Sequence, residues 1–167
     1  MNKTKLLTTM AVFVAIGTLG SQLIWFPAGV AKAYPVQHAI NVMAAVMLGT
    51  GPAVIIAFII GVLRNLLGLG SLLAFPGGMI GAFLAGILYK RFRHHFAAAI
   101  GEIIGTGVIG ALFAVPFAKI LMGTAFGALF FIPPFLVSSI AGSFIGVFIV
   151  LRINHHKIIE NNLKDGI

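Results

Sequence analysis

Long apolar stretches without a single acidic or basic residue make up most of this chain. They cover residues 6–31, 33–63, 65–89 and 120–151. A helix of about 20 apolar residues crosses the roughly 30 Å hydrocarbon core of a bilayer, so each stretch is long enough for at least one crossing. With 60% hydrophobic residues, the chain is predicted to be an all-α integral membrane protein and not a soluble domain.

The basic residues gather in clusters that predict the orientation in the membrane. The clusters are Lys3 and Lys5, the run 90–95, and the C-terminal group Arg152, Lys157 and Lys164. Cytoplasmic loops are enriched in Lys and Arg, so both termini and the 90–95 loop are expected inside. This orientation explains the net charge of +8 without nucleic-acid binding. We expect one transmembrane domain over residues 1–153 and a short cytoplasmic tail over residues 154–167.

Six transmembrane helices follow from this orientation. Two inside anchors require an even number of crossings between residues 5 and 90, and the segment is too long for only two. Breaks rich in Gly and Pro predict a first helix ending near residue 25, helices over 36–48 and 53–66, and a fourth ending at the basic loop. Two more helices are expected over 96–118 and 128–151. The second helix would be only about 20 Å long, so it should be tilted or capped by the preceding loop.

The N-terminal segment also has some features of a signal peptide. Lys3 and Lys5 precede an apolar stretch, and Ala31-Lys32-Ala33 resembles a cleavage site. The apolar stretch is longer than a usual signal peptide requires. We therefore expect it to remain as the first helix.

Small residues four positions apart predict close helix packing, because helices in lipid associate through such contacts. The pairs are Ala11/Ala15, Gly77/Gly81, Gly101/Gly105, Gly123/Gly127 and Gly142/Gly146.

Glu102 is the only acidic residue before residue 160, and it lies inside a predicted span. An ionisable residue at such a position is costly and is a candidate for function. Its carboxyl group could bind a ligand. Alternatively, it could pair with a histidine or with Arg64 on a neighbouring helix, or remain uncharged.

Other polar residues suggest a site for an uncharged polar solute. His38 and Asn41 are three positions apart and share one helical face, with Gln37 beside them. Hydrogen bonding between helices is an equally good explanation for this cluster. Arg64 and Asn65 end the third helix at the outer side, where they could bind an anion or fix a loop.

Two proline-containing segments predict a pocket near the outer face. Pro133 and Pro134 are expected to break the last helix, since proline lacks an N–H group. Irregular backbone at membrane depth is tolerated where it lines a cavity. Phe131 beside this break, and Phe75 at the start of the fourth helix, would supply aromatic walls.

The sequence does not indicate an enzyme. It contains no nucleotide-binding loop, no metalloprotease motif and no set of residues typical of a nucleophilic triad. No cofactor is expected, no histidines are spaced to suggest a metal site, and there is no cysteine. A transporter of this kind must use a gradient or obtain energy from a partner.

The chain resembles the S components of energy-coupling factor (ECF) vitamin transporters, in particular the ThiW branch. The general likeness lies in six glycine-rich helices and the Ala-x-x-x-Ala motif of the first helix, here Ala11 and Ala15. The segments that resemble ThiW are residues 27–42, 63–68, 73–82, 101–107 and 131–135.

The resemblance implies a substrate-binding subunit of the bacterial or archaeal cell membrane. It would bind the thiazole precursor of thiamin, hydroxyethylthiazole, in an outward-facing pocket. Ala11 and Ala15 would dock on a transmembrane coupling subunit, and two ABC ATPases would drive release inside. The residues expected to bind the substrate are Gln37, His38, Asn41, Arg64, Asn65, Phe75, Glu102, Thr106 and Phe131.

Two alternatives remain open at this point. The chain could be an S component for another vitamin, since pocket specificity does not follow from one sequence. It could also be a structural or assembly membrane protein without a ligand, in which His38, Asn41 and Glu102 only hold helices together.

Overall fold

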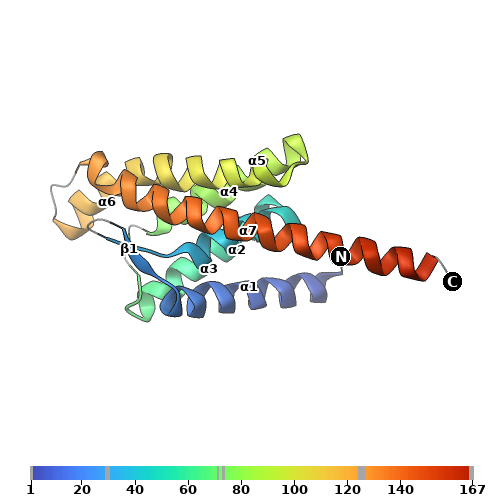
Figure 1. Ribbon diagram of the computed structural model, residues 1–167. Coiled ribbons are helices and arrows are strands. Elements are labelled where there is room, and N and C mark those ends of the chain that lie inside the picture. The colour runs from blue at the N-terminus through green and yellow to red at the C-terminus, as the bar shows by residue number, and fades with distance from the viewer. Residues whose placement is uncertain (1, 29–30, 71, 73, 124–126, 166–167) are drawn as a thin grey trace.

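The computed structural model is an elongated bundle of helices (Figure 1). It describes residues 2–28, 31–70, 72, 74–123 and 127–165. In these ranges the helices are α1 (Lys3–Leu23), α2 (Pro35–Met47), α3 (Thr50–Leu66), α4 (Ala74–Phe92), α5 (His95–Glu102), the π-helix η1 (Ile103–Gly110), α6 (Ala111–Met122) and α7 (Ala128–Asp165). Because α5, η1 and α6 follow one another without a gap, the described chain forms six continuous helical segments, as predicted.

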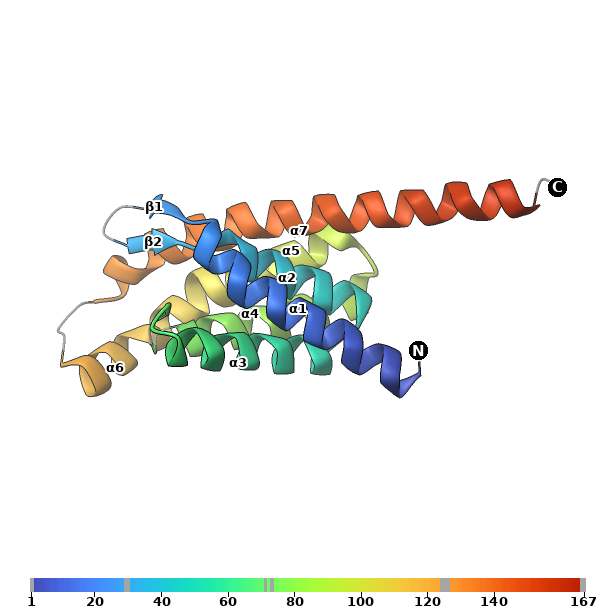
Figure 2. The same cartoon turned by 90° about the horizontal axis from the view of Figure 1, so that it is seen from below.

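Three of these segments are long and apolar enough to cross a membrane, within the part of the chain that the structure describes. They are Lys3–Leu23, His95–Leu121 and Ala128–Ile153, and Thr50–Leu66 is a shorter apolar helix. Six crossings therefore remain a prediction. Both termini lie at the same end of the bundle (Figure 1), and α7 extends beyond the other helices at that end (Figure 2).

The short helix α2 occupies the centre of the bundle. It packs against α1, α3, α4 and α7, and its residues from His38 to Ala45 are all buried. A helix of 13 residues can be accommodated there because other helices surround it, so its length is not limited by the bilayer. The apolar core beside it includes Val42, Ile56 and Ile60.

A two-stranded hairpin precedes this helix, packs against α7 and was not predicted. Strand β1 (Phe26–Ala28) pairs antiparallel with β2 (Ala31–Ala33), and Tyr34 then leads into α2. Strands of three residues leave too short a pattern for sequence analysis to detect.

The predicted helix break at Pro133 and Pro134 is wrong. Both prolines lie inside α7, which begins at Ala128. They remove the N–H groups that would bond to the carbonyls of Leu129 and Phe130, but the fixed φ of proline is itself helical. The remaining backbone bonds of this long helix are kept, so it continues through both prolines.

Glycines allow two close helix contacts. Gly142 and Gly146 of α7 lie against the backbone of α2. A Cβ added at Gly146 would lie 2.8 Å from the Ala39 carbonyl oxygen. Gly101 and Gly105 lie equally close to the backbone of α4. The packing predicted for these pairs is confirmed.

Two other small-residue pairs behave differently. Gly123 ends α6 with a positive φ of 65°, and no described residue lies within 4 Å of a Cβ added at Gly123 or Gly127, so the predicted packing of this pair is wrong. A left-handed residue at the end of a helix is a common role for glycine. Ala11 and Ala15 are exposed on the outer surface of α1.

The α4 contact provides a test of this packing. A Cβ at Gly101 would lie 2.6 Å from the Leu84 carbonyl carbon and 2.7 Å from the Ala85 nitrogen, and backbone atoms cannot move aside easily. We expect Gly101→Ala to destabilise the protein by about 1–3 kcal/mol, less any gain in helix propensity. The measurement is the apparent melting temperature in detergent. Gly51→Ala is the matched control, since no described residue lies within 4 Å of its added Cβ, and it should not lower the melting temperature.

Candidate functional site

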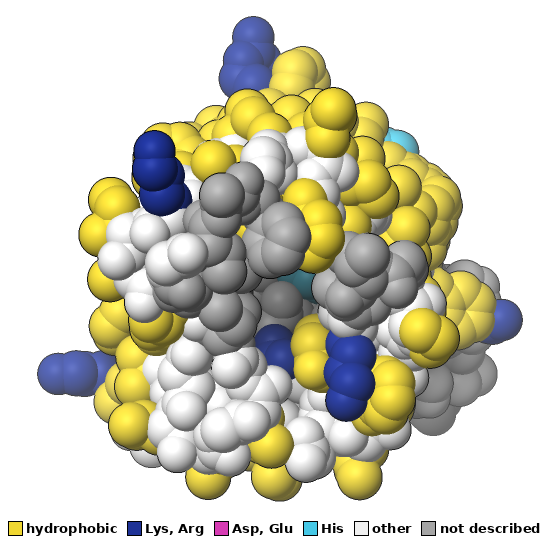
Figure 3. Space-filling model, turned by 90° about the vertical axis from the view of Figure 1, so that its left-hand side faces the viewer, with side chains coloured by type: hydrophobic (Ala, Val, Ile, Leu, Met, Phe, Trp, Pro, Cys, Tyr) yellow, Lys and Arg dark blue, Asp and Glu magenta, His cyan; other side chains and the backbone are white. Residues whose placement is uncertain are grey.

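A cavity of about 620 Å³ opens at the end of the bundle opposite the termini. Figure 3 views this end and shows a hollow with a histidine and a basic side chain at its bottom. The lining residues are Gln22, Lys32, Tyr34, Gln37, His38, Arg64, Gly68, Leu69, Gly70, Gly77, Gly78, Thr106, Phe130, Phe131, Pro134, Phe135 and Ser138. They come from α1, β2, α2, α3, α4, η1, α7 and the connections between them. The volume is within the range of small-molecule sites.

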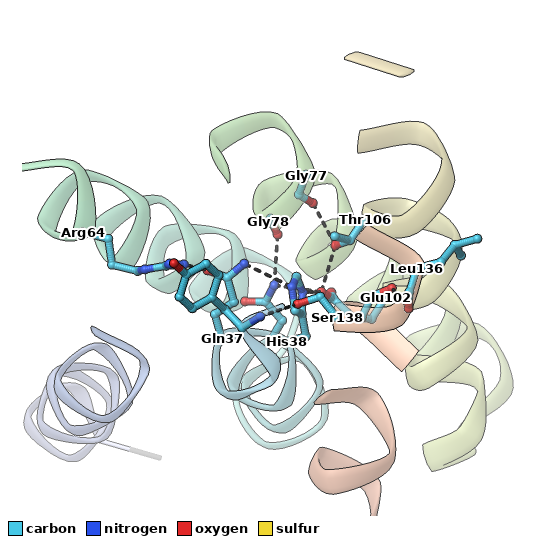
Figure 4. A network of polar contacts seen from close by, with 12 residues as sticks. Gln37, His38, Arg64, Gly77, Gly78, Glu102, Thr106, Leu136 and Ser138 are labelled. Carbon is cyan, nitrogen blue, oxygen red and sulfur yellow. Dashed lines mark hydrogen bonds and ion pairs between the residues drawn. The ribbon is translucent and has the colours of Figure 1, made fainter. Parts of the chain in front are cut away.

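The floor of the site is organised around the carboxyl group of Glu102, which is fully buried. One oxygen, Oε1, accepts bonds from His38 Nδ1 at 2.8 Å, Asn41 Nδ2 at 3.1 Å and Thr106 Oγ1 at 2.9 Å (Figure 4). The second oxygen has no partner among the described residues. Of the roles considered for Glu102, pairing with a histidine is therefore present in the structure. The shared face predicted for His38 and Asn41 is confirmed.

The next bonds fix the orientation of Gln37 and His38. Arg64 can only donate, and its Nη1 bonds to Gln37 Oε1, so the amide nitrogen of Gln37 must face His38. That nitrogen lies 3.1 Å from His38 Nε2. Since the amide nitrogen donates, Nε2 accepts and the proton is on Nδ1, which donates to Glu102. Arg64, Gln37, His38 and Glu102 thus form one chain of hydrogen bonds, which we call the polar relay.

Arg64 itself is buried, with 2% of its surface exposed. Its Nη2 donates to the Leu69 carbonyl at 3.1 Å, and its guanidinium carbon lies 4.2 Å from the centre of the Tyr34 ring. Its Nε has no hydrogen-bond partner among the described residues. The side chain therefore connects α3, the loop after it and the entrance to α2.

The π-helix η1 places Thr106 in this floor. It begins directly after Glu102, and Thr106 Oγ1 also lies 3.0 Å from the Gly77 carbonyl oxygen of α4. Single π-turns are often found at functional sites, and a run of eight residues is unusually long. Sequence analysis predicted an ordinary helix here. The dense spacing of Gly101, Gly105, Gly107 and Gly110 does not distinguish a π-helix from an α-helix.

The hairpin and the residue after it contribute lining residues that sequence analysis did not name individually. Lys32 and Tyr34 line the cavity, and the Tyr34 N–H donates to Ser138 Oγ at 2.8 Å. Ser138 and Gln22 also line the cavity, and sequence analysis named neither as a binding residue. Ser138 lies one turn after Pro134, and this spacing within α7 was the available signal.

Of the predicted binding residues, five line the cavity: Gln37, His38, Arg64, Thr106 and Phe131. Asn41 and Glu102 lie behind them as bonding partners. Asn65 and Phe75 are not part of the lining. The Asn65 side chain bonds to the Gly61 carbonyl of its own helix at 2.8 Å, and the Phe75 ring lies 5.9 Å from that of Phe58.

The described residues contain no group of three His, Cys, Asp or Glu side chains that could hold a metal ion. The floor combines hydrogen-bonding groups with aromatic walls from Phe130, Phe131 and Phe135, an arrangement that suits a small organic ligand.

Comparison with known families identifies the chain. The model of the thiamine-precursor transporter protein (ThiW) family matches residues 7–156. The chain belongs to the ThiW family. It is therefore a membrane protein and a component of a thiamine-precursor transporter, as the sequence resemblance predicted. No curated protein and no solved structure gave a match.

Glu102 gives a direct test of the floor. In Glu102→Gln, an amide nitrogen replaces one carboxylate oxygen. This nitrogen must face either the three donors that now bond to Oε1 or the tight space beside Gly81, where a Cβ added at Gly81 would lie 2.5 Å from Oε2. We expect the free energy of unfolding to fall by about 1–3 kcal/mol, because a buried donor is left unpaired. The measurement is the apparent melting temperature in detergent.

Ser139→Ala is the matched control for this variant. Ser139 is equally buried, but its hydroxyl donates to the Leu136 carbonyl of its own helix and not to another helix among the described residues. Ser139→Ala should lower the melting temperature less than Glu102→Gln does. An equal cost in both variants would argue against a special role for the Glu102 carboxylate.

Proposed function

We propose that the chain is the S component of an ECF-type importer and that its cavity binds hydroxyethylthiazole. Membership of a thiamine-precursor transporter family supports this proposal. The observation that carries it is the cavity at the end opposite the termini, whose floor is a relay of buried, hydrogen-bonded side chains. A purely structural role for these residues would not require an open cavity above them.

The residues proposed to contact the substrate are those that line the cavity. Gln37, Arg64, Thr106 and Phe131 come from four different helical segments, and Tyr34 and Ser138 join them from the hairpin connection and α7. Glu102 and Asn41 would act from behind by holding His38 and Thr106 in place. Asn65 and Phe75 are left out of the proposed site.

The size of the ligand sets a demand on this pocket. Hydroxyethylthiazole has about nine heavy atoms, and the best small ligands gain about 1.5 kcal/mol per atom. Nanomolar affinity needs about 12.3 kcal/mol, close to that ceiling. The ligand must therefore be almost fully enclosed by well-oriented groups. The polar relay already holds the donors and acceptors of the floor in place. Binding therefore costs little side-chain entropy, and more of the contact energy contributes to the affinity.

The energy for uptake would come from partners, since the sequence contains no nucleotide-binding motif. We propose that α1 docks on a transmembrane coupling subunit through Ala11 and Ala15, and that two ABC ATPases drive release on the cytoplasmic side. Both alanines are exposed, while Phe13 and Gly17 face the bundle. Small side chains at an exposed helix surface allow a second helix to approach closely in lipid.

The first test is calorimetric titration of the detergent-purified protein. We expect nanomolar binding of hydroxyethylthiazole and no comparable binding of thiamin or riboflavin. Tight binding of another vitamin would keep the S-component role and replace the substrate. If a folded protein binds none of the three, the structural or assembly role would be favoured instead.

The docking proposal has its own test. Ala15→Trp should abolish copurification with the coupling subunit and ATPases, because a bulky ring prevents close helix approach. It should leave substrate binding unchanged, as Ala15 is far along α1 from the cavity lining. The control is Ile16→Trp, a residue that is also exposed but points about 100° away around α1. An intact complex with Ala15→Trp would contradict docking through this surface.

A further inference from the structure

The charge of Arg64 has no acidic partner in the described part of the chain. Its contacts are the Gln37 amide, the Leu69 carbonyl and the Tyr34 ring, all of them neutral. A guanidinium group does not lose its proton in proteins, and this one is 98% buried at the edge of the cavity. A buried charge without a counter-charge is costly, so the site gains much if a ligand supplies one.

A second cation lies in the lining of the same cavity. Lys32 of β2 is exposed, and its ammonium nitrogen lies 4.0 Å from the centre of the Trp25 ring. An exposed charge at the opening of a cleft raises the local concentration of oppositely charged solutes. Lys32 and Arg64 therefore have complementary positions, one accessible to solvent and one buried.

The acid nearest to this pair does not face the cavity. Glu102 is fully buried, and its Oε1 is occupied by His38, Asn41 and Thr106. Two side chains, Gln37 and His38, separate it from Arg64 in the polar relay. No acidic residue is among those that line the cavity. The surface presented to a ligand is thus positively charged.

From these contacts we infer that the preferred ligand carries a negatively charged group, a phosphate ester or a carboxylate, which binds between Arg64 and Lys32. This inference rests on the proposed function and makes its substrate class more specific. The thiazole ring would lie toward Phe130, Phe131 and Phe135, and the anionic arm would point to the hairpin side. The unpartnered Nε of Arg64 supplies a donor that no described group uses. Arginine binds phosphate and carboxylate oxygens through two parallel N–H groups, which suits this position.

The test compares three probes by calorimetry on the same purified protein. They are hydroxyethylthiazole, its phosphate monoester, and the thiazole in which a carboxymethyl group replaces the hydroxyethyl arm. We expect at least one anionic probe to bind about tenfold or more tightly than the neutral alcohol, with an affinity that falls as salt is added.

Lys32→Gln should reduce this preference, because it removes one of the two cations. Lys119→Gln is the matched control: Lys119 is also exposed and the net charge changes equally, but the residue lies outside the lining. It should leave the preference unchanged. Arg64→Gln should abolish the preference, and thermal unfolding would verify that the variant is folded. Arg64→Lys keeps the charge and should retain part of the preference.

The results separate this inference from the proposed function. If the neutral alcohol binds as tightly as both anionic probes, or more tightly, the inference is overturned and the proposed function stands. A preference that survives Lys32→Gln and Arg64→Gln alike also overturns it. If a folded protein binds none of the three probes, the proposed function fails and the inference fails with it.

Discussion

The buried carboxyl group of Glu102 is the interaction on which the rest of the structure depends. It is placed inside a bundle that offers almost no other acid, and its Oε1 receives two donors from the central helix α2 and one from its own segment. Burying such a group without bonds would cost several kcal/mol. The bonds offset this cost only if α2, α5 and η1 stay in register. The cluster therefore defines one arrangement of the helices, where apolar contacts alone would permit several.

The close approach that these bonds require comes from glycine. A Cβ at Gly81 of α4 would lie 2.5 Å from Glu102 Oε2, so a larger residue would displace the carboxyl group. Gly105 lies on the other side of the same contact, and a Cβ added there would lie 2.8 Å from the Ile80 carbonyl oxygen. In a membrane, where apolar surface does not drive helices together, such contacts and interhelical hydrogen bonds are the main source of association. Packing and polar bonding therefore stabilise the same junction.

The sequence predicted the helical segments and part of the site, because both depend on local patterns. His38 and Asn41 share a face at a spacing of three, and both reach Glu102. Arg64 and Asn65 are neighbours and point about 100° apart, so only one can face the cavity, and the sequence could not tell which. The hairpin and the π-helix were missed for another reason. The strands are too short to leave a sequence pattern, and Tyr34 beside the hairpin and Thr106 in the π-helix bond to Ser138 and Gly77, which lie far away along the chain.

The position of α2 connects the cavity with the surface of α1. Gln37 and His38 in the first turns of α2 line the cavity, and the helix also packs against α1, where a Cβ added at Gly20 would meet the Val36 side chain at 2.7 Å. The opposite face of α1 carries Ala11 and Ala15 and remains exposed. Gln22 near the end of α1 also lines the cavity, so the helix proposed to dock reaches the cavity directly as well as through α2. Ala11 and Ala15 lie two to three turns from Gln22 along the same helix, which connects the cavity end of the bundle with the end where the termini lie.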